Sequence, residues 1–263
     1  MMSGRKKRKI FNKKRSHLNH SLRWISGISL GIVGLLFISL VIQGTHDFLS
    51  VLGLVTPSHS LSPQESWDEY QDYFENYSTK DLSPTFLAAL AQTESSGSFF
   101  LAPKWTFSLK RGPFQILKPE STAFGLMQLT ASQFAQSKNF CIQEQNPEST
   151  GKWYHVDGCW FNSMSTRLSP ANSIEHTSAF LQASVNHHVH GEGRQLVTEK
   201  IEIYSALLHH CGITDGLAWL EGDQSESVAP SCRGKSAKNY LDRLYKNKRV
   251  FDTLRSESEI ARK

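Results

Sequence analysis

The stretch Leu87-Ala88-Ala89-Leu90-Ala91-Gln92-Thr93-Glu94-Ser95-Ser96-Gly97 decides how this chain is organised. Its apolar half predicts a buried helix, and its polar half delivers one carboxylate, Glu94, to the turn at which Gly97 ends the helix. Apolar surroundings disfavour the charged form of a carboxyl group and raise its pKa. A carboxylic acid that stays protonated near neutral pH is suited to general-acid catalysis. We therefore expect Glu94 to be catalytic and to have a raised pKa.

The composition is that of an ordinary globular protein, because 39% of the 263 residues are apolar and 20% are charged. The net charge of +5 is unevenly distributed. Nine of the 29 Lys and Arg precede residue 24, where there is no Asp or Glu, so the remainder holds 20 basic and 24 acidic residues. A mildly acidic body does not resemble a nucleic-acid binder, and we expect no nucleic-acid partner.

Residues 24–43 predict one transmembrane helix. No charged residue occurs in the 23 positions between Arg23 and Asp47, which is enough to cross a bilayer core of about 30 Å. A cleaved signal peptide is the alternative, but its apolar region runs for about 7 to 15 residues and ends in small residues, unlike Val41-Ile42-Gln43. The basic segment 1–23 then places the N-terminus in the cytoplasm and the rest of the chain outside.

Residues 44–66 contain two prolines and five serines and predict a linker, so the body spans residues 67–263. Two Ser-Pro pairs, at Ser83 and Ser169, are typical of a helix N-cap followed by proline in the first turn. Aromatic side chains recur at helical spacing and predict a core face at Trp67, Tyr70, Phe74 and Tyr77. The expected helices are 67–77, one that starts at Pro84 and is stopped by Gly97, 124–136, 170–188, 194–210 and 235–254, which makes the body mainly α.

One small β-hairpin is expected at residues 105–117, where the sequence alternates around Gly112-Pro113. Residues 141–169 are rich in Gly, Pro, Asn and Ser and predict a long loop. The hairpin is then the only sheet.

Four cysteines follow the predicted span, on the side where disulfides form. Of the three possible connectivities we favour Cys141 to Cys159 and Cys211 to Cys232, because each closes a loop of about 20 residues and contributes roughly 3 kcal/mol. The chain has no C-x-x-C or H-E-x-x-H spacing, so we expect no metal and no cofactor.

Glu94-Ser95-Ser96-Gly97, followed by Ser121-Thr122-Ala123-Phe124-Gly125-Leu126-Met127-Gln128-Leu129, resembles the lytic transglycosylase family. The likeness continues in Pro170-Ala171-Asn172-Ser173-Ile174 and in Lys238-Asn239-Tyr240-Leu241, and it covers about residues 83 to 250. It implies a lysozyme-like catalytic domain of the soluble-lytic-transglycosylase type, related to goose-type lysozyme.

The resemblance implies that Glu94 is the catalytic residue and that peptidoglycan glycan strands are the substrate. The implied substrate-binding residues are Ser95, Ser121, Gly125, Met127, Gln128, His209 and Tyr240. Two departures stand out: Thr130-Ala131 replaces Met-Pro after Leu129, and the family's Ala-Tyr-Asn-x-Gly falls on Leu208-His209-His210-Cys211-Gly212. With the predicted topology, the family implies a single-pass inner-membrane protein of bacteria whose catalytic domain lies in the periplasm.

Glycoside cleavage normally uses two carboxylates, and Glu94 has no evident partner because Glu120 is typical of an exposed loop charge. A single acid fits cleavage assisted by the N-acetyl group of the sugar, with a 1,6-anhydro product. A goose-type lysozyme, which hydrolyses the same bond with water, is the first alternative. A non-catalytic peptidoglycan-binding scaffold of an envelope machine is the second.

The charge asymmetry around residues 24–43 predicts the topology of the chain. A reporter fused after residue 66 should be active if it functions only in the periplasm and inactive if it functions only in the cytoplasm. The opposite pattern, or release of a soluble fragment by signal peptidase, contradicts the prediction.

Overall fold

The computed structural model describes residues 60–99, 105–107, 117–119, 122–149, 167, 169–222, 231–232 and 235–262, together with Val33, Gly34 and Phe37. The chain divides into two compact units, residues 1–51 with 104–120 and residues 52–103 with 121–263. In the described part, no helix is long and apolar enough to cross a membrane. The predicted span 24–43 lies outside the described residues except for Val33, Gly34 and Phe37, which are helical.

The first unit contains the expected hairpin. Strands β1 (Trp105–Phe107) and β2 (Leu117–Pro119) pair antiparallel, with Thr106 opposite Lys118. The prediction that this would be the only sheet is wrong, because the second unit contains two more hairpins. They are β3 (Phe140–Gln143) with β4 (Asn146–Ser149), inside the segment expected to be a long loop, and β5 (Ser231–Cys232) with β6 (Lys235–Ser236).

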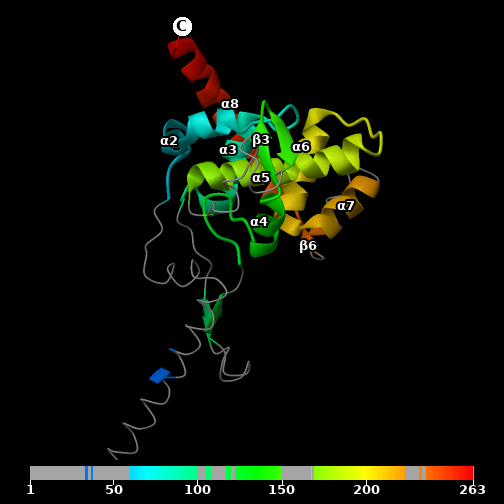
Figure 1. Cartoon of the computed structure of the whole chain (residues 1–263). Coiled ribbons are helices and arrows are strands. Elements are labelled where there is room, and N and C mark those ends of the chain that lie inside the picture. The colour runs from blue at the N-terminus through cyan, green and yellow to red at the C-terminus, as the bar shows by residue number, and fades with distance from the viewer. Residues whose placement is uncertain are drawn as a thin grey trace, which may run out of the picture. The chain divides into compact units, whose positions relative to one another are not determined.

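The second unit is mainly helical, as predicted, and its elements follow the chain as drawn in Figure 1. Its helices are α2 (Pro63–Asn76), α3 (Pro84–Ser95), α4 (Ala131–Ser137), α5 (Pro170–Val185), α6 (Thr198–Cys211), α7 (Ile213–Glu221) and α8 (Lys238–Ala261), and α5 continues into the π-helical turn η3 (Asn186–His190).

Helix α2 begins inside the segment predicted to be a linker. Ser62 accepts a hydrogen bond from the amide of Glu65, and the Glu65 carboxylate accepts one from the amide of Ser62, which forms a capping box around Pro63. Leu61 adds two contacts, since its amide donates to the carbonyl of Ser96 and its carbonyl accepts from Gln92. The folded body therefore includes the last residues of the predicted linker.

Helix α3 is buried on every side and forms the centre of this unit. Its N-cap is Ser83, whose hydroxyl accepts from the amide of Phe86, and every residue from Thr85 to Ala91 is buried. The helix ends as predicted: Ser96 has φ 54° and Gly97 has φ 73°, the left-handed conformation that stops a helix. Figure 1 shows α2, α3 and α8 lying together, in agreement with their mutual contacts.

The predicted aromatic face of α2 is confirmed as core. Trp67 and Phe74 are fully buried and stack at a centroid distance of 6.2 Å. Phe251 of α8 packs on the same indole at 5.9 Å, and Ser258 accepts a hydrogen bond from Trp67 Nε1. These contacts hold α8 against α2 along much of its length.

The expected helix over residues 124–136 is wrong in its first half. Residues 124–129 form a tight turn that is closed by a bridge between Phe124 and Leu129, and α4 begins only at Ala131. Gly125 has φ 83° and Gln128 has φ 48°, values that no α-helix accommodates. Phe124, Leu126, Met127 and Leu129 are all buried, so their apolar character reflects burial of a turn and not one face of a helix.

Glycine at position 125 is required by both its backbone angle and its surroundings. A Cβ at this position meets the backbone carbonyl of Arg167, whereas a Cβ at Gly193, where φ is 69°, meets nothing within 4 Å. Comparing the two glycines separates the effect of the backbone angle from that of the contact. Both have a positive φ, but only at Gly125 does a Cβ collide with the Arg167 carbonyl.

We predict that Gly125→Ala destabilises the protein by about 3 kcal/mol or more, since the cost of a positive φ adds to that of overpacking. Gly193→Ala should cost only about 1–2 kcal/mol. Urea unfolding followed by circular dichroism measures both losses. Equal losses in the two variants would contradict the role assigned to the Arg167 contact.

Candidate active site

Glu94 is held at the end of the buried helix. It is the last residue but one of α3, and its side chain is 13% exposed. The buried run from Thr85 to Ala91 fixes the helix, so the carboxylate has little freedom to move away from the surrounding elements. A negative charge at a helix C-terminus is unfavourable with the helix dipole, and other groups must stabilise it.

Tyr240 supplies one such group. Its hydroxyl donates a hydrogen bond of 2.7 Å to Oε1 of Glu94 from the first turn of α8. Burial raises the pKa of Tyr240 well above its usual value, and the charge of Glu94 raises it further, so the hydroxyl keeps its proton and acts as a donor. A second link joins the same helices, because Asn247 donates to the hydroxyl of Thr93.

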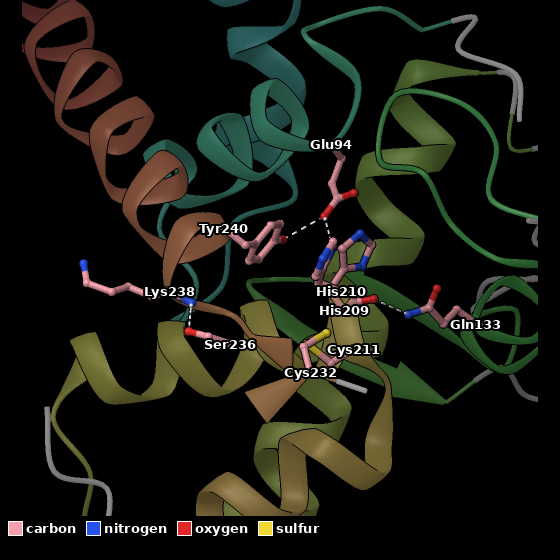
Figure 2. The surroundings of a disulfide bond; sticks show 9 residues. All are labelled: Glu94, Gln133, His209, His210, Cys211, Cys232, Ser236, Lys238 and Tyr240. Carbon is pink, nitrogen blue, oxygen red and sulfur yellow. Dashed lines mark hydrogen bonds and ion pairs between the residues drawn. A yellow bond between two sulfur atoms is a disulfide. The ribbon is translucent and has the colours of Figure 1, made fainter. Parts of the chain in front are cut away.

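His210 supplies the other group, from the last turn of α6. Its Nδ1 lies 3.4 Å from Oε1 of Glu94, and its ring stacks on that of Tyr240 at a centroid distance of 3.9 Å and an interplanar angle of 13°. The side chain is 39% exposed. Figure 2 shows Tyr240 and His210 converging on the same carboxylate oxygen.

The electrostatics of Glu94 differ from the sequence prediction. Burial raises the pKa of its carboxyl group, but the hydrogen bonds from His210 and Tyr240, and the positive charge of the two neighbouring histidines when protonated, outweigh burial. The net pKa is below the usual value, so the prediction of a raised pKa is wrong. The expectation considered only the apolar helix and not the donors that α6 and α8 bring to its end.

His209, an expected sugar contact, lies buried beside the 124–129 turn. It is 5% exposed, and its Nε2 donates a 2.8 Å hydrogen bond to the carbonyl of Met127. Gln133 of α4 donates to the carbonyl of His209 at 2.8 Å. Burial lowers the pKa of His209, so the ring is neutral near pH 7. His209 therefore ties the 124–129 turn to α6, and its role as a sugar contact stays a prediction.

The other predicted binding residues divide into two groups. Ser95 is 2% exposed and its hydroxyl donates to the carbonyl of Ala91, so its side chain is turned into its own helix and not toward a substrate. Gly125 and Met127 are buried in the turn, where the amide of Met127 donates to Ser173 Oγ, and Gln128 is half-buried with its side-chain amide bonded to the Gly125 carbonyl. Ser121 lies outside the described residues.

The disulfide between Cys211 and Cys232 confirms one predicted pairing. It joins the end of α6, directly after His210, to the β5–β6 hairpin that leads into α8 and Tyr240 (Figure 2). Cys141 is also disulfide-bonded, and its predicted partner Cys159 lies outside the described residues. Within the residues that are described, no cluster of three or more His, Cys, Asp or Glu is arranged to hold a metal ion.

Comparisons of this chain with protein-family models, with curated proteins and with solved structures gave no match. The geometry of the site therefore carries the functional argument.

His210 is the site residue that the sequence argument missed. Successive residues on an α-helix point about 100° apart, so only one of two adjacent histidines can face the 124–129 turn. The family motif drew attention to His209, whereas the buried face of α6 turns His209 inward and leaves His210 beside Glu94. The rotation of α6 about its own axis decides which histidine faces Glu94. That rotation is set by tertiary packing, and no local pattern in the sequence predicts it.

The hydrogen bond from Tyr240 predicts a measurable change in Glu94. We expect Tyr240→Phe to raise the pKa of Glu94, because a donor that lowers this pKa is removed. Loss of a bond to a charged acceptor should also cost about 1.5–3 kcal/mol of stability. The titration can be followed by the ¹³C shift of the Glu94 carboxyl carbon.

Tyr245→Phe is the matched control, since the Tyr245 hydroxyl, on the same helix, donates to the backbone carbonyl of Glu199 instead. It should leave the titration of Glu94 unchanged. An unchanged Glu94 midpoint in Tyr240→Phe would show that the Tyr240 hydroxyl does not stabilise the carboxylate.

Proposed function

We propose that this chain is a membrane-anchored peptidoglycan lytic transglycosylase with a lysozyme-like catalytic domain. On this proposal it cleaves the β-1,4 bond between N-acetylmuramic acid and N-acetylglucosamine and leaves 1,6-anhydro ends. The observation that carries the proposal is a largely buried carboxylate, Glu94, held by Tyr240 and His210. The groups that act on Glu94 are histidines and a tyrosine, and none of those described is a second carboxylate.

Two of the resembled motifs, which lie far apart in the sequence, meet at this carboxylate. Glu94 and Tyr240 are 146 positions apart and share a hydrogen bond. The turn that contains Gly125, Met127 and Gln128 is fastened through His209 to α6, the same helix that presents His210. This agreement between motif and geometry supports the family resemblance independently of each short motif.

The proposed reaction needs one residue to act twice. Glu94 first donates a proton to the bridging oxygen, the C1–O bond breaks, and the N-acetyl oxygen of the sugar stabilises the cationic C1. The carboxylate then takes the proton of the 6-hydroxyl, whose oxygen closes on C1. Glu94 ends protonated again and no water is consumed, so the products are an anhydro end and a free 4-hydroxyl.

The hydrogen bonds divide the work between the two carboxylate oxygens. Tyr240 and His210 both contact Oε1 of Glu94, and no described residue forms a hydrogen bond with Oε2. Oε2 is then the oxygen that exchanges a proton with the substrate, while Oε1 keeps the carboxylate in place. The lowered pKa suits the second step, in which Glu94 is a base, and the first step requires the protonated minority form.

The proposed location rests on the charge distribution and on the cysteines. Disulfides persist in oxidising compartments, and the Cys211–Cys232 bond lies in the part of the chain that the positive-inside rule places outside the cytoplasm. We propose a single-pass inner-membrane protein with its catalytic domain in the periplasm, where glycan strands of peptidoglycan are its partner.

The test is Glu94→Gln in the full-length chain, digesting purified peptidoglycan, with the products analysed by mass spectrometry. The wild type should release 1,6-anhydro muropeptides. The variant keeps the shape of the side chain but cannot transfer a proton, so its turnover should fall by about 10²- to 10⁴-fold. Full length matters because a fragment that begins at residue 67 would lose the capping box of α2.

Glu120→Gln is the control, because Glu120 is the next carboxylate after Glu94 along the chain and the candidate for a second catalytic group. It should retain full activity. Reducing-end products from the wild type would identify a goose-type lysozyme. Binding of peptidoglycan with no cleavage by either protein would identify a scaffold.

A further inference from the structure

The imidazole beside Glu94 is the feature that the proposed reaction does not yet use. His210 lies 3.4 Å from Oε1, is stacked on Tyr240, and is exposed enough to exchange protons with water. Histidine is the side chain whose charge ordinarily changes between about pH 5 and pH 8. An imidazole that gains a proton while it lies against the catalytic carboxylate changes how that carboxylate responds to pH.

The surroundings of His210 identify which charges it meets among the described residues. Helix α3 presents Glu94, and α8 presents the hydroxyl of Tyr240, on which Arg243 also acts. Helix α6 itself presents His209, which is buried and neutral. Among these groups, Glu94 is thus the acidic one in contact with His210.

Two groups this close titrate as a pair. When His210 is neutral, each unit fall in pH raises the protonated fraction of Glu94 tenfold. Once His210 is charged, the proton held by the pair resides on the imidazole, and the carboxylate stays ionised. The pair then has one proton, which lies either on His210 or on Glu94, and the ratio of these two forms does not depend on pH. A further fall in pH therefore adds little of the form in which Glu94 holds that proton.

We infer that His210 is a positioning residue that restrains the proposed general acid: its charged form holds Glu94 ionised and so limits glycan cleavage when the pH falls. This inference rests on the proposed function and concerns the regulation of the same site. On a lytic enzyme, such a restraint keeps cleavage nearly constant under acid conditions, in which an unrestrained carboxylic acid becomes steadily more active.

The test compares the pH profile of kcat/KM for anhydro-product formation in the wild type and in His210→Asn, both full length. The wild-type profile should level off at acid pH, once His210 carries a charge. The variant should continue to rise toward the titration of the carboxyl group, and at pH 5 its activity should exceed that of the wild type by on the order of tenfold. Parallel profiles in the two proteins would overturn the inference.

Two further variants guard against a merely structural effect. His210→Gln is a second uncharged replacement and should give the same change in profile. His190→Asn is the matched control, because His190 also pairs with a carboxylate, Asp81 at 2.8 Å, but on η3. It should keep the wild-type profile.

A second measurement separates this inference from the proposed function. The ¹³C titration of the Glu94 carboxyl carbon requires no turnover, and its midpoint should be higher in His210→Asn than in the wild type and unchanged in His190→Asn. If the wild type forms no anhydro product, the proposed function fails while the titration still decides whether His210 acts on Glu94. An identical Glu94 midpoint in the wild type and in His210→Asn would overturn the inference whatever the activity.

Discussion

The structure of the second unit depends on the burial of α3. From Thr85 to Ala91 this helix exposes almost no surface, so it has no solvent face and must be surrounded by other elements. Helices α2 and α8 supply much of that cover. Because the helix cannot rotate without exposing apolar side chains, its first acidic residue is fixed in position. Glu94 leaves the apolar run at the C-terminal end, where the helix dipole opposes its charge.

The residues around Glu94 offset this unfavourable interaction between its charge and the helix dipole. A carboxylate that is largely buried needs donors, and two converge on one of its oxygens from different helices. Their combined effect exceeds that of burial, and the pKa of Glu94 falls. The same arrangement therefore favours the ionised form of Glu94 in the folded protein.

The features that the sequence predicted correctly are those with local causes. The Ser-Pro pairs at Ser83 and Ser169 begin helices because serine caps and proline fits the first turn. The aromatic spacing in α2 reports its core face, and the short separation of Cys211 and Cys232 favours their pairing. Each of these signals involves residues close in the chain, and no knowledge of the tertiary structure was needed.

The features that were missed have distant causes. The 124–129 turn contains enough apolar residues to imitate a helix, but its conformation is set by Ser173 and Arg167, which bond the Met127 amide and the Leu129 carbonyl. In the same way, the direction of the pKa shift of Glu94 depends on Tyr240 and His210. A sequence pattern marks a candidate carboxylate more readily than it identifies the environment that sets the protonation of that carboxylate.

The position of the disulfide links this environment to the compartment. Cys211 directly follows His210, and Cys232 lies on the hairpin that precedes α8, so the bond joins the two segments that bring His210 and Tyr240 to Glu94. The stacked pair of rings requires the end of α6 and the start of α8 to keep a fixed separation. A cross-link restricts the unfolded chain and shortens the range of separations that these segments can sample. Thiols remain reduced in the cytoplasm, so this support for the site requires an oxidising compartment, which is the kind of compartment in the proposed location.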